Sequence, residues 1–259
     1  MSIEAAIKIF DPRTVKLDGG RGRASLHWDD IASMLGTVER SNPVGYQLMM
    51  VKFRDDQRQE AALRENVTSW AEKLCLKHRL IDERLIVRMC LTAVDLLFNR
   101  PLSTQQRSLQ HLHRLYGPYA RRESTRMKKL KKTLNSELKK QESRQRNDRI
   151  YFLEEQIAVS RQHINSWVEA HAKASTQCPR CRGTGVITLP QHGKCPVCNG
   201  DRFIAPSHKE VVRHIGSNYA SVEGNWFVMD ECRWWLADCA NAATTHLHEL
   251  FDLNTNELT

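Results

Sequence analysis

Four of the eight cysteines in the 259-residue chain stand in two Cys-x-x-Cys pairs. The first pair lies in Cys178-Pro-Arg-Cys181 and the second in Cys195-Pro-Val-Cys198, with thirteen residues between the pairs. A two-residue spacing lets a tight turn bring two thiolates to one metal ion, and the arm between the pairs folds back to bring the other two. Glycines follow both pairs and suit such turns. The sequence therefore predicts one four-cysteine Zn²⁺ site.

Four thiolates fill the tetrahedral coordination of Zn²⁺ and leave no position for water or substrate, so the ion is expected to be structural. We accordingly expect a protein that is not an enzyme. The chain also has no His-Glu-x-x-His motif of a zinc hydrolase and no His-x-Glu partner for a zinc deaminase. The spacing leaves open two disulfides or four unrelated buried thiols. No apolar signal segment opens the chain, which favours a reducing compartment and metal binding.

The other four cysteines, Cys75, Cys90, Cys232 and Cys239, lie among apolar residues at helical spacing. Each is expected to be a small buried hydrophobic residue.

Charge is concentrated in one stretch of the chain. The net charge is +9, which favours an anionic partner such as nucleic acid. Residues 121–149 hold twelve basic and four acidic residues, an excess of eight, so the remainder is nearly neutral. No apolar run reaches the roughly twenty residues of a membrane span. We expect no membrane association.

Periodicity places the predicted sites on a mainly α fold. Apolar residues recur at spacings of three and four over 57–77, 82–98 and 226–252. Breaks are expected at Asn42-Pro43 and Gly224-Asn225. The expected organisation is a flexible arm (1–27), a helical core (28–120), a basic long helix or helical hairpin (121–170), a zinc knuckle (171–205) and a helix-turn-helix-like DNA-binding unit with the C-terminal helix (206–259).

Helix starts carry capping signals. Ser103 or Thr104 is expected to cap a helix that ends at Gly117-Pro118. Ser207 and Glu210 are spaced as a capping box. The basic segment is either one long helix or two with a break near 143–147, paired as an antiparallel hairpin with its charges outside. Two roles for these charges stay open, a solvated face and direct nucleic-acid contact.

Several blocks of the sequence, the two cysteine pairs among them, resemble the zinc-finger branch of the late-gene antitermination protein Q family of lambdoid phages. The likeness runs in order through Met1-Ser-Ile-Glu-Ala-Ala-Ile-Lys-Ile-Phe-Asp-Pro-Arg13, residues 28–53 with Asp30-Ile31-Ala-Ser-Met34-Leu35-Gly36 and Pro43-Val44-Gly45, both Cys-x-x-Cys knuckles, and Asn225-Trp226. Between about residues 103 and 161 the chain is longer than that family, so no role for the basic segment follows.

The resemblance implies a phage transcription antitermination factor in the cytoplasm of the bacterial host. Such a protein binds double-stranded DNA at the late promoter and joins host RNA polymerase that holds its sigma factor at a pause. It then suppresses pausing and termination so that late genes are transcribed. A Nus elongation factor is a further expected partner.

DNA contacts are predicted from the basic residues around the knuckles and the helix that follows them. These side chains can neutralise phosphates or read bases. The candidates are Arg180, Arg182, Lys194, Arg202, Lys209 and Arg213.

Two other functions are consistent with the same residues. A zinc-containing DNA-binding regulator of the repressor kind would need no polymerase. A chaperone cysteine-rich domain shares the Cys-x-x-Cys-x-Gly-x-Gly pattern of 178–185, but the second knuckle departs from it at Asp201-Arg202 and the chain has no His-Pro-Asp of a J domain.

Overall fold

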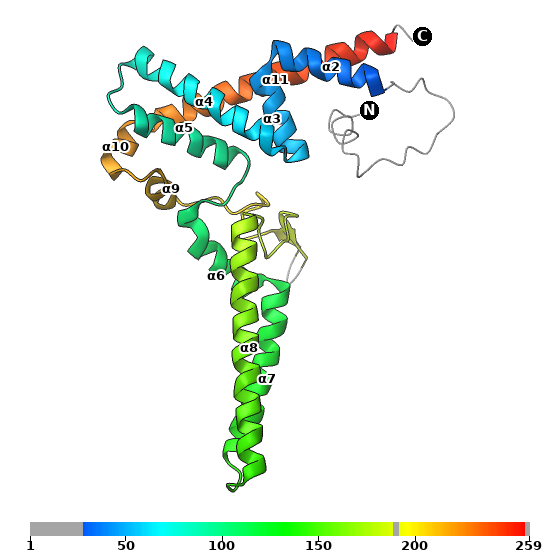
Figure 1. Cartoon of the computed structure of the whole chain (residues 1–259), viewed down its shortest axis with the longest axis vertical. Coiled ribbons are helices and arrows are strands. Elements are labelled where there is room, and N and C mark those ends of the chain that lie inside the picture. Colours follow the sequence, from blue (N-terminus) through cyan, green and yellow to red (C-terminus); the bar gives the residue numbers. More distant parts are fainter. Residues whose placement is uncertain (1–27, 189–191, 257–259) are drawn as a thin grey trace. The chain divides into compact units, whose positions relative to one another are not determined.

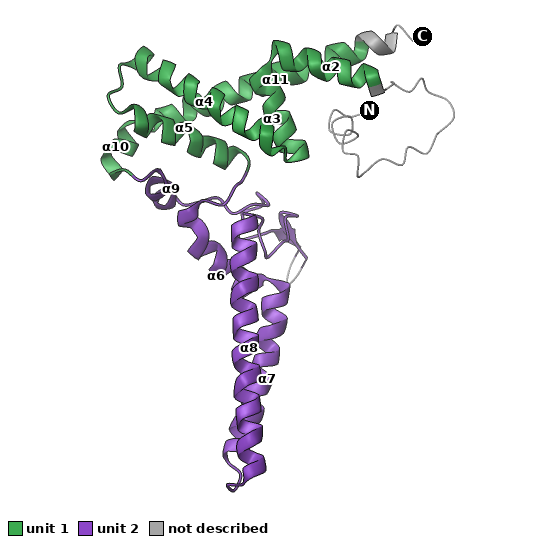
Figure 2. Ribbon diagram, in the orientation of Figure 1, with its two compact units in different colours: residues 1–98, 217–259 green, residues 99–216 purple. Residues whose placement is uncertain are grey.

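The computed structural model describes residues 28–188 and 192–256, and helices account for most of them. The mainly α fold is therefore confirmed, while the arm expected over residues 1–27 lies outside the described residues. The chain forms two units, shown in Figure 2. Unit 1 takes the residues up to Phe98 and those from Ser217 on, and unit 2 is the segment Asn99–Gly216 between them. Unit 2 is thus inserted between two helices of unit 1, and the finer domain boundaries expected from sequence stay a prediction.

Unit 1 consists of helices α2 (Trp28–Ser41), α3 (Pro43–Arg54), α4 (Gln57–His78), α5 (Glu83–Leu97), α10 (Tyr219–Gly224) and α11 (Phe227–Asn256). Local signals set several of their ends. Pro43 begins α3 directly after α2, as the Asn42-Pro43 break predicts. The Asp56 carboxylate accepts the backbone N–H groups of Arg58 and Gln59 at the start of α4, and Asp82 accepts that of Leu85 at the start of α5.

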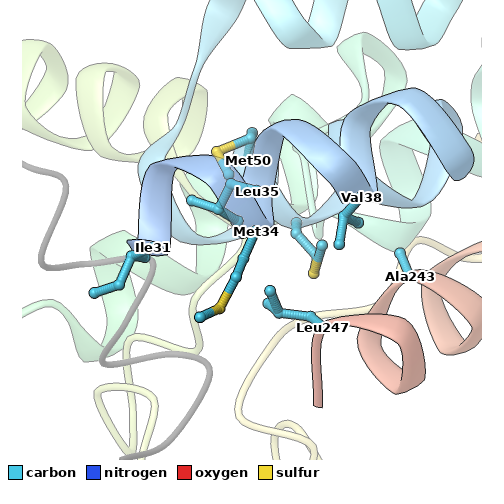
Figure 3. Close-up of a cluster of buried hydrophobic side chains, with 8 residues drawn as sticks. Ile31, Met34, Leu35, Val38, Met50, Ala243 and Leu247 are labelled. Carbon is cyan, nitrogen blue, oxygen red and sulfur yellow. The ribbon is translucent and has the colours of Figure 1, made fainter. Parts of the chain in front are cut away.

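The core of unit 1 forms where α11 packs against α2 and α3. Figure 3 shows Val38 of α2, Met50 of α3 and Leu247 of α11 meeting in one buried cluster. Nearer the start of α11, the Trp235 ring stacks on Trp70 of α4 with centroids 4.8 Å apart. The C-terminal helix therefore closes a core that the N-terminal helices begin.

Unit 2 consists of a short 3-10 helix η1 (Ser103–Gln105), helices α6 (Gln106–Tyr116), α7 (Pro118–Leu138), α8 (Arg144–Ala174) and α9 (His208–Ile215), and strands β1 (Val186–Ile187) and β2 (Gly193–Lys194). The two strands pair antiparallel, Val186 with Lys194 and Ile187 with Gly193.

The basic segment forms the antiparallel hairpin rather than one long helix. α7 and α8 run side by side in Figure 1, joined by a turn at 139–143. Ser143 ends the turn by accepting the N–H of Arg146 as the N-cap of α8. Near the base of the hairpin, Ala120 of α7 packs against Ile164 and Val168 of α8.

The expected cap at Ser103 or Thr104 is wrong. Neither side chain accepts a helix N–H group, because both hydroxyls face α9. Thr104 Oγ1 donates to the carbonyl of Glu210 at 2.6 Å, and Ser103 Oγ lies 3.1 Å from His214 Nδ1. Tertiary hydrogen bonds therefore replace the local cap.

The capping box of α9 is confirmed. The Glu210 carboxylate accepts the Ser207 N–H at 2.7 Å and the Ser207 hydroxyl at 2.8 Å. Because α9 belongs to unit 2 whereas α10 and α11 belong to unit 1, the helix-turn-helix expected over 206–259 stays a prediction. Among the described residues no helix is both long and apolar enough to cross a membrane.

A glycine sets the distance between α3 and α11. A Cβ on Gly45 would lie 2.2 Å from the carbonyl oxygen of Cys239, so Gly45→Ala must push the two helices apart. We expect a loss of about 1–3 kcal/mol of unfolding free energy, measured by urea denaturation. Gly36→Ala on α2 is the matched control, because nothing lies within 4 Å of its Cβ. The control should gain about 0.5–1 kcal/mol, and equal effects of both changes would contradict the close approach.

A buried histidine predicts acid sensitivity in unit 2. His113 is 7% exposed, and both ring nitrogens lack a hydrogen-bond partner among the described residues. Burial, and then the nearby His171, lower its pKa below the ordinary value. As pH falls below about 6.5 the unfolded chain takes up the proton first, so stability should decrease with falling pH.

His113→Phe keeps a ring against Trp167, whose centroid lies 5.8 Å away, but cannot be protonated. Thermal unfolding followed through that pH range should show a weaker loss of melting temperature in this variant than in the wild type. An unchanged pH dependence would show that His113 does not contribute.

Candidate metal centre

The four cysteines of the two knuckles form one buried cluster. Their Sγ atoms all lie within 4.8 Å of one another. Across the two pairs, Cys178 Sγ is 3.8 Å from Cys195 Sγ and Cys181 Sγ is 3.7 Å from Cys198 Sγ. A disulfide requires about 2.05 Å, and these cysteines are free thiols. Four sulfurs around a metal at about 2.3 Å would be about 3.8 Å apart, so the site has the size of a tetrahedral thiolate centre.

The two knuckles repeat one backbone pattern, shifted by seventeen residues. The Cys181 carbonyl accepts the N–H of Thr184 at 3.1 Å, and the Cys198 carbonyl accepts that of Asp201 at 2.8 Å. Hydrogen bonds between the knuckles match as well. Cys178 N–H donates to the carbonyl of Arg202 and Cys195 N–H donates to that of Gly185, both at 2.9 Å. The knuckles are therefore related by a local two-fold arrangement around the cluster.

Left-handed backbone residues build this pattern in both knuckles. Matched positions have similar φ, 53° at Arg182 and 52° at Asn199, and 79° at Gly185 and 69° at Arg202. Glycine is required at Gly185, because a Cβ there would lie 2.5 Å from the carbonyl oxygen of Gly200. Arg202 stands where the first knuckle has Gly185, yet the turn is kept. The arginine adopts a left-handed backbone conformation that residues other than glycine rarely adopt.

The same turns aim backbone N–H groups at the sulfurs. Burial raises the pKa of the Cys178 thiol to about 12. For Cys181, burial alone would raise the pKa. Hydrogen bonds from backbone N–H groups, that of Gly185 among them, and from the neighbouring thiols outweigh burial and lower the pKa to about 7. For Cys198, burial raises the pKa and outweighs the hydrogen bond from the backbone N–H of Gly200, which lowers it. Donors of this kind stabilise thiolates, the form in which cysteine binds metal.

Hydrogen bonds anchor the segment that carries the four knuckle cysteines, residues 176–204, called the metal module below, within unit 2. Thr176, at the end of α8, donates through Oγ1 to the carbonyl of Asn99 at 2.7 Å, and its own carbonyl accepts the N–H of Ile204 at 2.7 Å. The buried side chain of Gln105 donates through Nε2 to the carbonyl of Ile204 at 2.8 Å. Both ends of the module are therefore tied to the segment around η1.

The remaining cysteines take no part in the cluster. Cys75, Cys90 and Cys232 are buried and Cys239 is half-buried. In the part of the chain that the structure describes, the four knuckle cysteines make the one group of metal-ligating side chains. Three of the other four are therefore the buried hydrophobic residues that their spacing predicts.

The residues predicted to contact DNA all lie in unit 2, and most are exposed. Arg182 and Arg202 stand at the matched turns, Lys194 is on β2, and Lys209 and Arg213 are one turn apart on α9. Their contact with DNA stays a prediction.

Arg180 differs from the other candidates. It is half-buried, with its guanidinium over the ring of Tyr116 at 5.3 Å from the centroid. Sequence reasoning missed this tyrosine, because the two residues are brought together only by folding.

A family model described as Conserved hypothetical protein CHP02642 matches residues 1–258. No curated protein and no solved structure matches the chain.

The cluster predicts one tightly bound metal ion per chain. Cys178→Ser should remove the ion, because the hydroxyl of serine is a far weaker ligand for a soft metal than thiolate. Metal content after purification and desalting should fall from one equivalent to a small fraction of that. Cys239→Ser changes a cysteine of unit 1 in the same way and should retain the full equivalent. Metal lost from both proteins would place the ligands elsewhere.

Proposed function

The chain belongs to the family described as Conserved hypothetical protein CHP02642, and we propose that it binds duplex DNA through a module built on one structural zinc ion and acts in transcription antitermination. The observation that carries the DNA-binding proposal is the buried cluster of four thiols with Arg182, Lys194 and Arg202 exposed on the same short segment.

Zinc is the ion that this ligand set favours. Four cysteine sulfurs at tetrahedral spacing suit Zn²⁺ or an iron–sulfur cluster among common metals, and the observed Sγ separations of 3.7 and 3.8 Å match a single ion. Four protein ligands leave no open position for water or substrate, so the ion holds the fold and performs no catalysis.

The DNA-binding proposal rests on charge beside a rigid backbone. Arg182 and Arg202 project from turns that the metal would hold, and Arg213 is exposed on α9, which hydrogen bonds fasten to η1. Basic side chains on a rigid framework can contact phosphates without first being ordered. We propose that the six predicted residues form this contact surface.

The antitermination proposal rests on the ordered sequence blocks that resemble the phage Q family. In that role the protein would bind the late promoter and join the paused RNA polymerase with its sigma factor, with a Nus factor as a further partner. It would act in the cytoplasm of the bacterial host. Two units suit this division of work, because unit 2 carries the predicted DNA contacts and leaves unit 1 for a protein partner.

Transcription in vitro tests the proposal. Bacterial RNA polymerase holoenzyme transcribes from the phage's own late promoter through a strong terminator, with and without the protein. We expect readthrough that requires both the promoter-proximal DNA and the metal site, so Cys178→Ser should abolish it. Arg182→Gln with Arg202→Gln should weaken it while the metal content stays at one equivalent.

The outcomes separate the two DNA-binding functions. Unchanged termination with promoter DNA still bound would favour a repressor-like regulator that does not use polymerase. No DNA binding at all would remove both readings and leave the metal as a fold-holding ion only.

A further inference from the structure

Helix α7 carries a basic face that the metal centre does not use. It consists of Arg121, Arg122, Lys128, Lys129 and Lys132, all exposed, and is called the α7 face below. With 3.6 residues per turn, Arg121, Lys128 and Lys132 form one stripe, and Arg122 and Lys129 form the adjoining stripe. The opposite side of the helix, with Ala120 and Met127, packs toward α8. The cations therefore share the solvent side of the hairpin.

No carboxylate offsets these charges on the face. The two acids of α7 lie elsewhere on the helix: Glu123 is 8% exposed and has Arg126 Nη1 at 3.6 Å, and Glu137 pairs with Lys140 at 2.7 Å. Lys128, Lys129 and Lys132 make no ion pair with any described residue. Like charges one turn apart repel, so an anionic partner would relieve a repulsion that the free protein carries.

We propose that the α7 face binds the phosphate backbone of duplex DNA. From Arg121 to Lys132 the face is about 16 Å long, over which one strand of a duplex presents about five phosphates.

The hairpin geometry makes this contact independent of base sequence. A single helix of about 10–12 Å fits the major groove, which is about 12 Å wide. α7 is packed along α8 (Figure 1), and the pair is too broad to enter the groove. The lysines therefore meet phosphates at the groove edge and not the bases.

A duplex fits this face better than a single strand. Single-stranded sites stack bases on aromatic side chains, and residues 120–138 contain no aromatic residue. The one aromatic residue of α7, Tyr119, is already occupied: it stacks on Trp167 with centroids 5.6 Å apart, and the Arg122 guanidinium lies over it at 5.6 Å.

The α7 face begins close to the metal module. Gly117 and Pro118 separate Tyr116, which lies under Arg180 of the first knuckle, from Tyr119, which lies under Arg122. Both arginines are thus held on rings at the turn between α6 and α7. This proposal needs neither antitermination nor a specific promoter, and its contacts add to those proposed for the module.

Fluorescence anisotropy with an arbitrary duplex of about 20 base pairs tests the proposal, with salt raised from about 50 to about 200 mM. The test variant is Lys128→Gln, Lys129→Gln, Lys132→Gln in the full chain. Each phosphate contact contributes about 0.9 to the slope of log affinity against log salt, so the slope should flatten by about 2.7. The advantage of the wild type over the variant should shrink about 40-fold across that range.

The matched control is Arg58→Gln, Lys73→Gln, Arg84→Gln, which removes the same charge from exposed positions of unit 1 and should leave the slope near that of the wild type. Lys132→Gln alone should flatten it by about 0.9. Metal content and helical circular dichroism confirm folding in each protein.

Equal slopes for the test and control variants would overturn the proposal. So would tighter binding of a single-stranded RNA of the same length, if it depends on these lysines. Duplex binding that survives in the test variant while binding of polyglutamate is lost would assign the face to an acidic protein and also overturn it. The arbitrary duplex keeps this result separate from promoter-dependent readthrough.

Discussion

The gathering of four buried thiols into one cluster of a size to hold a metal ion is the constraint on which the segment between α8 and α9 depends. Between the end of α8 and the start of α9, the regular structure of the described residues is limited to two strands of two residues each. Among the described residues, the apolar side chains that pack around the cysteines are the partly buried Ile187, Val197 and Ile204. So little apolar surface cannot offset the conformational entropy of ordering such a segment. A bound metal ion, which supplies on the order of 10 kcal/mol in small zinc modules, would be large enough to do so.

The local two-fold arrangement explains how a short segment meets that constraint. In each knuckle, backbone N–H groups donate to the sulfurs, and the carbonyl of the second cysteine accepts a hydrogen bond within its own turn. The backbone N–H of the first cysteine donates to a carbonyl of the other knuckle. The two halves thus satisfy each other's polar groups where the one sheet has only two residues in each strand. Arg202 shows that the arrangement tolerates a side chain in the left-handed region at one of the two matched positions, while the carbonyl of Gly200 excludes it at Gly185.

Unit 1 is held by a different kind of interaction, direct helix packing. α11 returns from the far end of the sequence to cover α2, α3 and α5, and the close approach at Gly45 brings its backbone against α3. The charges follow the same division, because the excess of basic residues over 121–149 falls wholly in unit 2, where the five cations of the α7 face are exposed.

The sequence by itself determined the parts that local chemistry controls. Cysteine spacing predicted the candidate ligand set, and apolar periodicity predicted helices. Pro43 and the pair Ser207 and Glu210 predicted where helices begin, and Gly224 predicted where one ends. Only the tertiary structure decided what distant residues do to one another. Ser103 and Thr104 carry good capping side chains, yet hydrogen bonds to α9 outweigh the local option. Tyr116 comes to lie under Arg180, and α9 joins unit 2 while α10 and α11 join unit 1. Such partners are chosen by burial and hydrogen bonding across the folded chain, for which a single sequence has no periodic signal.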